Sequence, residues 1–262
     1  MMRSLNIGAT GMLAQQTNVE VISHNIANMN TTAYQRRRAE FQDLLYQNMR
    51  RVGSDSSDAS TTVPTGVQIG LGVKTAAVYR ITQSGNLVLT ENPLDLAING
   101  EGFFQVELPS GDTGYTRSGS FQLDDNGDIV TVDGYIVQPA INIPAEAIEV
   151  TVNKSGEVYY SQDGTTTLTN AGQLELAIFA NQAGLIAIGD NLFEETDASG
   201  TATTGTPGDD GYGTIEQGFL ETSNVNAVEE ITNLITAQRA YEMNSKVIET
   251  SDQMLATLTN LR

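Results

Sequence analysis

The stretch NVEVISHNIANMNTTAYQRRRAEF, residues 18–41, decides how this chain is organised. Its first part places Val19, Ile22 and Ile26 at helical spacing on one face. The pattern then stops in small polar side chains over residues 25–31, and a basic, aromatic segment follows. We therefore expect a long N-terminal helix that leaves its last turn through a specific polar exit.

The helical pattern extends from this stretch back to about residue 4. One apolar position recurs every seventh residue and predicts a seam for packing against another helix. The second seam position is only partly apolar, because Gly8 and Gln15 share it with Ile22. The residues expected on these seams are Leu5, Met12, Val19, Ile22 and Ile26.

A second, longer helix is predicted near the other end of the chain, over residues 224–262. We expect Asn224 to cap its first turn, and Glu229 and Glu230 to face the positive end of the helix dipole. The seam residues expected on this helix are Ala227, Ile231, Leu234, Tyr241, Ile248 and Leu255.

Two terminal helices with heptad seams, separated by a non-helical middle, favour a coiled-coil-like pairing of the termini. The alternative is an ordinary pair of helices packed on a β domain. Polar residues such as Gln15, Gln238 and Asn244 interrupt the seams. Such residues favour helices with polar neighbours on several sides over an isolated two-stranded coiled coil.

The middle of the chain, residues 67–222, consists of short alternating runs that predict β-strands. Turn dipeptides of the Asn-Gly and Asp-Gly type separate them at residues 126–127, 133–134, 163–164 and 210–211. A β-sandwich, a meander or an irregular barrel fits this pattern.

The predicted fold class is therefore mixed α and β, with long terminal helices and an all-β middle domain. Four segments are expected: 1–45, the N-terminal helix and chain reversal; 46–66, an extended insertion or loop; 67–222, a β-rich outer domain; and 223–262, the helix that completes an inner helical domain.

The composition excludes several classes of function. With 32 acidic and 13 basic residues the formal net charge is -19, which repels nucleic acid and anionic lipid surfaces. The absence of Cys excludes disulfides, thiol catalysis and thiolate metal sites. No segment has the roughly 18 consecutive apolar residues of a membrane span. The N-terminus lacks the apolar core of a cleaved secretion signal, so we expect a cytoplasmic protein or export without cleavage.

No catalytic, cofactor-binding or metal-binding motif stands out. The acidic run DDNGD at residues 124–128 has the wrong spacing for a calcium loop and predicts a hairpin turn instead. Gly100 and Gly102 lack the third glycine and the βαβ context of a dinucleotide loop. A pair of catalytic carboxylates brought together by the fold stays open. These observations favour a structural or interaction protein, with no cofactor and no metal.

The opening stretch resembles the N-terminal signature of the bacterial flagellar rod and hook family. The matching residues of the turn are Asn25, Ile26, Ala27, Asn28, Thr31 and Tyr34. The sequence departs from the signature at Ala33, where the family usually has Gly, and at Gln35, where it usually has a basic residue. Residues 92–106, 115–138 and 217–255 resemble the family's later motifs, in the same order.

The resemblance implies a non-enzymatic subunit that assembles with copies of itself into a helical tube. Residues 220–246, the insertion at residues 50–66 and the chain length are most similar to the branch that forms the distal rod. The implied partners are the proximal rod proteins, the hook protein, the P-ring and L-ring proteins and the flagellar type III export apparatus. The implied location is the basal body, where the rod spans the periplasm. A hook or proximal rod subunit is the alternative within the family, and a secreted β-domain adhesin or enzyme is the alternative outside it.

Overall fold

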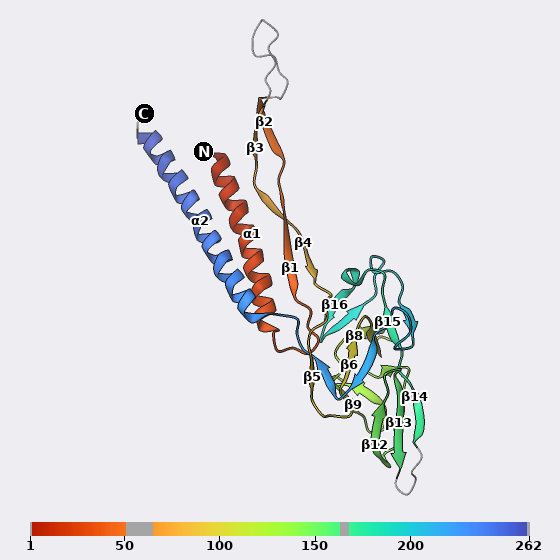
Figure 1. Ribbon diagram of the computed structural model, residues 1–262. Helices are drawn as coiled ribbons and strands as arrows, with labels where there is room; N and C mark the ends of the chain where they lie inside the picture. Colours follow the sequence, from red (N-terminus) through yellow and green to blue (C-terminus); the bar gives the residue numbers. More distant parts are fainter. Residues whose placement is uncertain (1, 51–64, 163–167, 261–262) are drawn as a thin grey trace. The chain divides into compact units, whose positions relative to one another are not determined.

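The computed structural model describes residues 2–50, 65–162 and 168–260 (Figure 1). The chain forms two compact units, each built from segments that are distant in sequence. Unit 1 contains Met1–Ala27, Arg37–Tyr79 and Asn226–Arg262, and unit 2 contains Asn28–Arg36 and Arg80–Val225. The expected β domain began at residue 67, whereas unit 2 takes up the chain at Arg80, and the strands before it share a unit with the helices.

The helices of unit 1 are α1 (Met2–Ala27) and α2 (Ala227–Asn260), which lie side by side and antiparallel (Figure 1). Two contacts fix this direction. The hydroxyl of Ser251 lies 3.1 Å from that of Ser4, and the side chain of Asn25 lies 3.3 Å from that of Glu230.

The cap of α2 differs from the expected one. The Asn226 side-chain oxygen accepts the N–H of Val228 at 3.1 Å, two residues into the helix, which is the geometry of an N-cap. The prediction that Asn224 caps this helix was wrong, because its side chain binds two other segments of the chain. Glu229 and Glu230 do lie in the first turn of α2, where the helix dipole favours negative charge.

The strands of unit 1 form two-stranded ribbons. β1 (Arg37–Asp43) pairs with β4 (Val73–Arg80), and β2 (Tyr46–Arg50) pairs antiparallel with β3 (Val67–Gly70). Strand β1 also contacts α1. The first five residues of the expected 46–66 insertion are thus a paired strand, and residues 51–64 of that insertion lie outside the described residues.

Unit 2 is built of short strands, and its described strands pair antiparallel. Its largest sheet has the order β16-β17-β8-β7-β15-β18, with β11 added to β7. A 3-10 turn, η1 (Gln182–Gly184), precedes β16. The strands are β5 (Leu87–Leu89), β6 (Leu96–Asn99), β7 (Phe103–Glu107), β8 (Thr113–Thr116), β9 (Phe121–Leu123), β10 (Ile129–Thr131), β11 (Val137–Gln138), β12 (Ala147–Val152), β13 (Glu157–Gln162), β14 (Thr169–Gln173), β15 (Leu176–Ile178), β16 (Ile186–Gly189), β17 (Leu192–Glu194), β18 (Thr203–Gly205), β19 (Thr214–Gln217) and β20 (Phe219–Glu221).

Strand β7 divides the core of unit 2 into two apolar clusters. Successive strand residues point to opposite faces. Phe104 accordingly belongs to the larger cluster and meets Phe121 edge to face at 5.1 Å. Phe103 belongs to the smaller cluster, in which its ring meets those of Phe179 and Phe193 at 5.9 Å each. Both faces of this strand are therefore buried.

The turn signals of the sequence are confirmed where the structure describes them. Gly127, Gly134 and Gly211 all have positive φ, which glycine adopts without steric cost. The DDNGD run closes the β9–β10 hairpin, as predicted. There the backbone N–H groups of Asp128 and Asn126 donate to the Asp124 carboxylate. These bonds lower the pKa of Asp124, and the bond from Asp128 has the larger effect. The turn expected at residues 163–164 lies outside the described residues.

A mixed fold with a helix at each end and a mostly β middle is therefore confirmed.

Candidate assembly interface

Asn25, in the polar exit of α1, is buried, and both its side-chain amide and its side-chain oxygen form hydrogen bonds. Its amide group donates to the Arg37 carbonyl at 2.8 Å and to Glu230 Oε2 at 3.3 Å. Its side-chain oxygen accepts the Arg37 N–H at 2.8 Å. The side chain thus pairs with the backbone of β1 as a neighbouring strand would, and it also reaches the first turn of α2.

The following residues reverse the chain. Ala27 is the last residue of α1 and is exposed. The Asn28 carbonyl accepts the Thr31 N–H at 3.1 Å, and the Thr31 hydroxyl lies 3.2 Å from Asn28 Oδ1. The Thr31 carbonyl in turn accepts the Tyr34 N–H at 3.3 Å. Backbone bonds therefore close this turn, and the Asn28 and Thr31 side chains pair with each other across it.

Ala33 occupies a left-handed backbone conformation, with φ of 55°, at the position where glycine is usual in the signature. It is 5% exposed, and its N–H donates to the Glu221 carbonyl at 2.8 Å. The left-handed region costs a residue with a Cβ about 1–2 kcal/mol.

We expect Ala33→Val to lower the free energy of unfolding by about 2–3 kcal/mol, because a β-branched side chain neither adopts this conformation nor fits the buried site. Ala33→Gly should change it by less than about 1 kcal/mol, since relief of strain is offset by a more flexible unfolded chain. Urea denaturation of the three proteins measures both values, and equal stabilities for the Val and Gly variants would contradict a left-handed Ala33.

The residues predicted on the helix seams have different degrees of burial. Ile22 is buried, whereas Ile231 and Tyr241 are 49% and 44% exposed on α2. The half-buried seam residues are Leu5, Met12, Val19, Ile26, Ala227, Leu234, Ile248 and Leu255.

Small and polar residues lie where the helices meet, although in the heptad pattern they interrupt the apolar seams. A Cβ on Gly8 would lie 2.9 Å from Ile248 Cγ1, and one on Gly11 would lie 2.9 Å from Asn244 Nδ2. Gly8 was expected to weaken the seam, but its lack of a side chain allows α2 to approach. No sequence signal marked this contact. Buried or half-buried residues of α2 recur every seventh position at Glu230, Ala237, Asn244 and Ser251, but this is a pattern of burial that only the folded chain shows.

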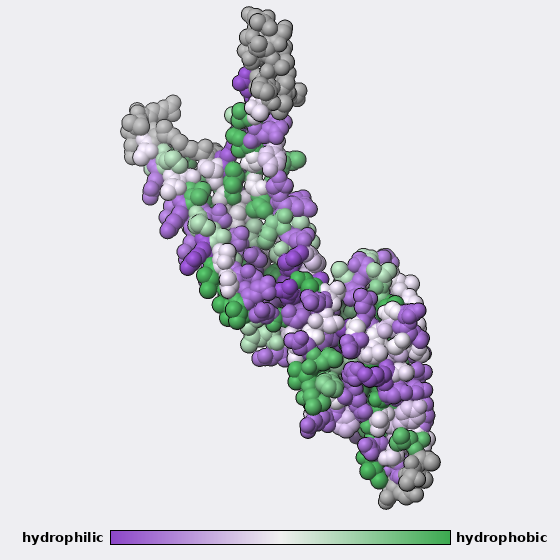
Figure 2. All heavy atoms as spheres, in the orientation of Figure 1, coloured by the Kyte–Doolittle hydropathy of each residue, from purple (hydrophilic) through white to green (hydrophobic). Residues whose placement is uncertain are grey.

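Large apolar side chains remain on the surface of unit 1. On α2 the exposed fraction is 75% for Val228 and 45% for Ile235. On the β2–β3 ribbon and just before it, Leu45, Tyr46 and Met49 are all more than half exposed. Figure 2 shows this apolar surface interspersed with polar side chains along α2 and the ribbon. Exposed apolar side chains in such numbers are typical of a surface that associates with other proteins.

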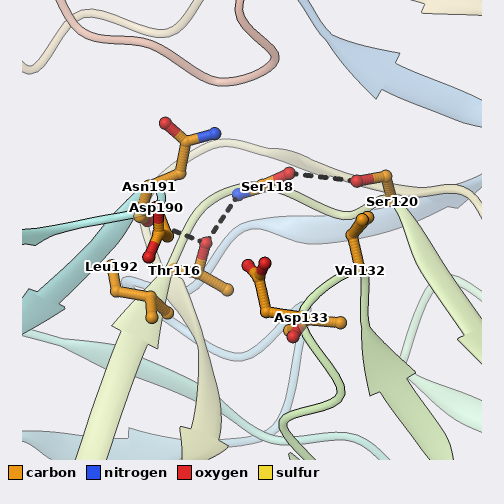
Figure 3. Close-up of a pocket in the computed structure, with 9 residues that line it drawn as sticks. Thr116, Ser118, Ser120, Val132, Asp133, Asp190, Asn191 and Leu192 are labelled. Atoms are coloured by element: carbon orange, nitrogen blue, oxygen red, sulfur yellow. Dashed lines mark hydrogen bonds between the residues drawn. The ribbon is translucent and has the colours of Figure 1, made fainter.

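A small cavity in unit 2 is lined by hydroxyl and carboxylate side chains (Figure 3). The Thr116 hydroxyl donates to the Asn191 carbonyl at 3.0 Å and accepts the Ser118 N–H at 3.1 Å, while Ser118 pairs with Ser120. The volume is about 90 Å³. Ligand pockets usually hold about 300–1,000 Å³, so this cavity has room for a few water molecules and no substrate.

The described residues contain no group of three or more His, Cys, Asp or Glu side chains arranged to hold a metal ion. Among them, neither helix contains a stretch long and apolar enough to cross a bilayer.

Comparisons with known proteins identify the chain through matches along its length. Residues 5–35 match the model described as "Flagella basal body rod protein", residues 97–160 the "Flagellar hook protein FlgE/F/G D1 domain", and residues 216–261 the "Flagellar basal body rod FlgEFG protein C-terminal". A protein of Caulobacter vibrioides named flagellar basal-body rod protein FlgG is 59% identical over 100% of both chains. The chain belongs to the FlgG family of flagellar basal-body rod proteins.

Other FlgG proteins are similar over a comparable length. The protein of Agrobacterium fabrum is 54% identical over 98% of both chains, and that of Bacillus subtilis is 40% identical over 100% of both. The resemblance to the flagellar rod and hook family, and to its distal-rod branch, is thereby confirmed. The chain is a structural component of the flagellar distal rod.

Proposed function

We propose that the chain assembles with copies of itself into a rigid helical tube, the distal rod, which transmits torque to the hook. Exposed apolar side chains on helix α2 of unit 1 support this proposal. Val228, Ile231 and Ile235 follow one face of α2 and stay 75%, 49% and 45% exposed in the single chain. In a helical lattice, side chains of neighbouring copies would remove them from water and stabilise the assembly.

The terminal helices would form the coiled-coil-like inner domain of this tube. Within one chain, close contacts at Gly8 and Gly11 and polar contacts at Asn25 join the helices. Between chains, exposed seam residues such as Ile231 and Tyr241 would make further contacts. The turn motif, Asn25 to Tyr34, would fix the direction in which the chain leaves the inner domain formed by the helices.

Proximal rod proteins, the hook protein, and the P-ring and L-ring proteins are the proposed partners. The chain would reach its place in the periplasm-spanning rod through the flagellar type III export apparatus. A structural role, and not an enzymatic one, is proposed because the relatives of the chain are flagellar rod proteins.

We expect Ile231→Glu to reduce the number of completed hooks per cell by at least about tenfold, because it places a charge in a contact that assembly would bury. Folding of the single chain should change by less than about 0.5 kcal/mol, since Ile231 is half exposed. Hook counts by electron microscopy and thermal melts of the purified protein measure the two effects.

Asn233→Glu is the matched control, since it adds the same charge at an exposed position of the same turn of α2. It should leave hook number unchanged. Equal hook numbers in the two variants would argue against burial of Ile231 between subunits.

The assignment itself is tested by immunogold electron microscopy of purified basal bodies with an antibody to residues 67–222. We expect label on the rod between the rings and the hook base. Label on the hook alone, or on no axial part of an intact basal body, would overturn the distal-rod function.

A further inference from the structure

The chain passes between units 1 and 2 at four points, after residues 27, 36, 79 and 225. Three of these points lie at the end of a segment of unit 2 that we call a connecting segment. Residues 32–36 end at the second point, residues 80–86 begin after the third, and residues 219–225 end at the fourth. Any force that one unit exerts on the other through the covalent chain enters unit 2 by one of these connecting segments or at Asn28, after the fourth point.

Asn224 bonds to the two other connecting segments at once. Its side-chain oxygen accepts the Arg36 N–H at 2.7 Å. Its amide group donates to the Ile81 carbonyl at 3.0 Å and to the Gln83 carbonyl at 2.7 Å. Both amide hydrogens and one acceptor position of the side chain are therefore used to join backbone groups from different parts of the sequence.

Backbone bonds complete the junction. The Asn224 N–H donates to the Tyr34 carbonyl at 3.3 Å, and the Ile81 N–H donates to the Arg36 carbonyl at 2.9 Å. The Ala33 N–H donates to the Glu221 carbonyl at 2.8 Å. The Thr222 N–H also donates to the Asn86 carbonyl at 2.8 Å. Residues 32–36, 80–86 and 219–225 are thus joined by single backbone bonds, and the Asn224 side chain adds three more bonds among them.

We propose that Asn224 is the positioning residue of this junction: it holds the three connecting segments of unit 2 together so that torsional load entering by one of them is shared by all. This role rests on the proposed function as a rod subunit. An amide is suited to it because it donates and accepts like a peptide group, whereas a carboxylate at this position would face two carbonyl oxygens.

Hydrogen exchange of the purified full chain tests the junction itself. The informative amide is Ile81 N–H, because it bonds to Arg36 and not to Asn224. In Asn224→Ala we expect its exchange to accelerate at least about tenfold, and in Asn224→Asp by more, because separation of the segments exposes it. The control is Asn142→Ala, which removes two comparable amide bonds, to Asn126 and Asp128, away from the connecting segments. Ile81 exchange less than about threefold faster in both Asn224 variants would overturn the proposal.

Swimming of cells in media of increasing viscosity tests the load. In a strain that lacks the native gene, the Asn224→Ala protein should support swimming at low viscosity but lose at least about half of the wild-type speed at high viscosity, while Asn142→Ala should match the wild type. Wild-type speed at high load, with Ile81 exchange accelerated, would overturn load sharing and leave the rod function intact. A wild-type gene that restores neither swimming nor rod label would overturn the proposed function instead.

Discussion

Replacing Arg117 by Ala is expected to lower the free energy of unfolding of unit 2 by about 3–5 kcal/mol. Arg117 and Glu221 are 4% and 3% exposed, and their charged groups lie 2.6 Å apart. Without the guanidinium, the Glu221 carboxylate would stay buried with no positive partner. The same change also removes donors from the carbonyls of Gly100 and Gly102, at 2.7 and 2.9 Å.

The measurement is urea denaturation followed by near-ultraviolet circular dichroism, because most of the tyrosines belong to unit 2. Arg117→Ala combined with Glu221→Gln should recover part of the loss, since Gln keeps an acceptor for the Gly85 N–H but carries no charge. Lys154→Ala is the control: it removes an exposed ion pair with Glu216 and should cost less than about 1 kcal/mol. A loss below about 1 kcal/mol in Arg117→Ala would show that water reaches Glu221 and that the pair is not a structural centre of unit 2.

Replacing Asn25 by Ala is expected to lower the free energy of unfolding of unit 1 by about 2–4 kcal/mol and to abolish motility. The Arg37 N–H and carbonyl would each lose the bond that the Asn25 side chain makes, and so would Glu230. Each buried group left without a partner costs about 1–3 kcal/mol. Because Asn25 joins α1 to β1 and to α2, the loss should appear as a lower melting temperature of the helices in far-ultraviolet circular dichroism.

Asn25→Asp should be worse than Asn25→Ala at neutral pH. It keeps the acceptor for Arg37 N–H but places a second carboxylate 3.3 Å from Glu230 Oε2. Two like charges at this distance raise the pKa of a carboxyl group in the folded state above its unfolded value. Protonation then favours the folded state, so the stability deficit of Asn25→Asp should shrink as pH falls.

Asn6→Ala, at an exposed position of the same helix, corrects for the higher helix propensity of Ala and should be neutral or slightly stabilising. If Asn25→Asp proved as stable as the wild type at neutral pH, the close approach of Asn25 to Glu230 would be wrong.

The elements that depend on neighbouring residues could be predicted from the amino-acid sequence. Heptad spacing located both terminal helices, and Asn-Gly and Asp-Gly pairs located turns such as those at Gly127 and Gly134. The family resemblance, and not the local sequence, pointed to Ala33 as a position where glycine is usual, and this residue has positive φ. The helices and the turns follow from short-range sterics and periodicity, which the local sequence contains in full.

The contacts between residues that are distant in the sequence could not be predicted and became visible in the folded chain. Asn224 looked like a helix cap, yet its partners Arg36 and Ile81 lie more than a hundred residues away in sequence. The same holds for Arg117 and Glu221, and for Gly8, whose place at the helix contact depends on Ile248. A hydrogen-bonding or small residue can serve a turn, a cap or a distant backbone equally well. Its role is set by which buried polar groups would otherwise lack a partner, and that is fixed only when the chain has folded.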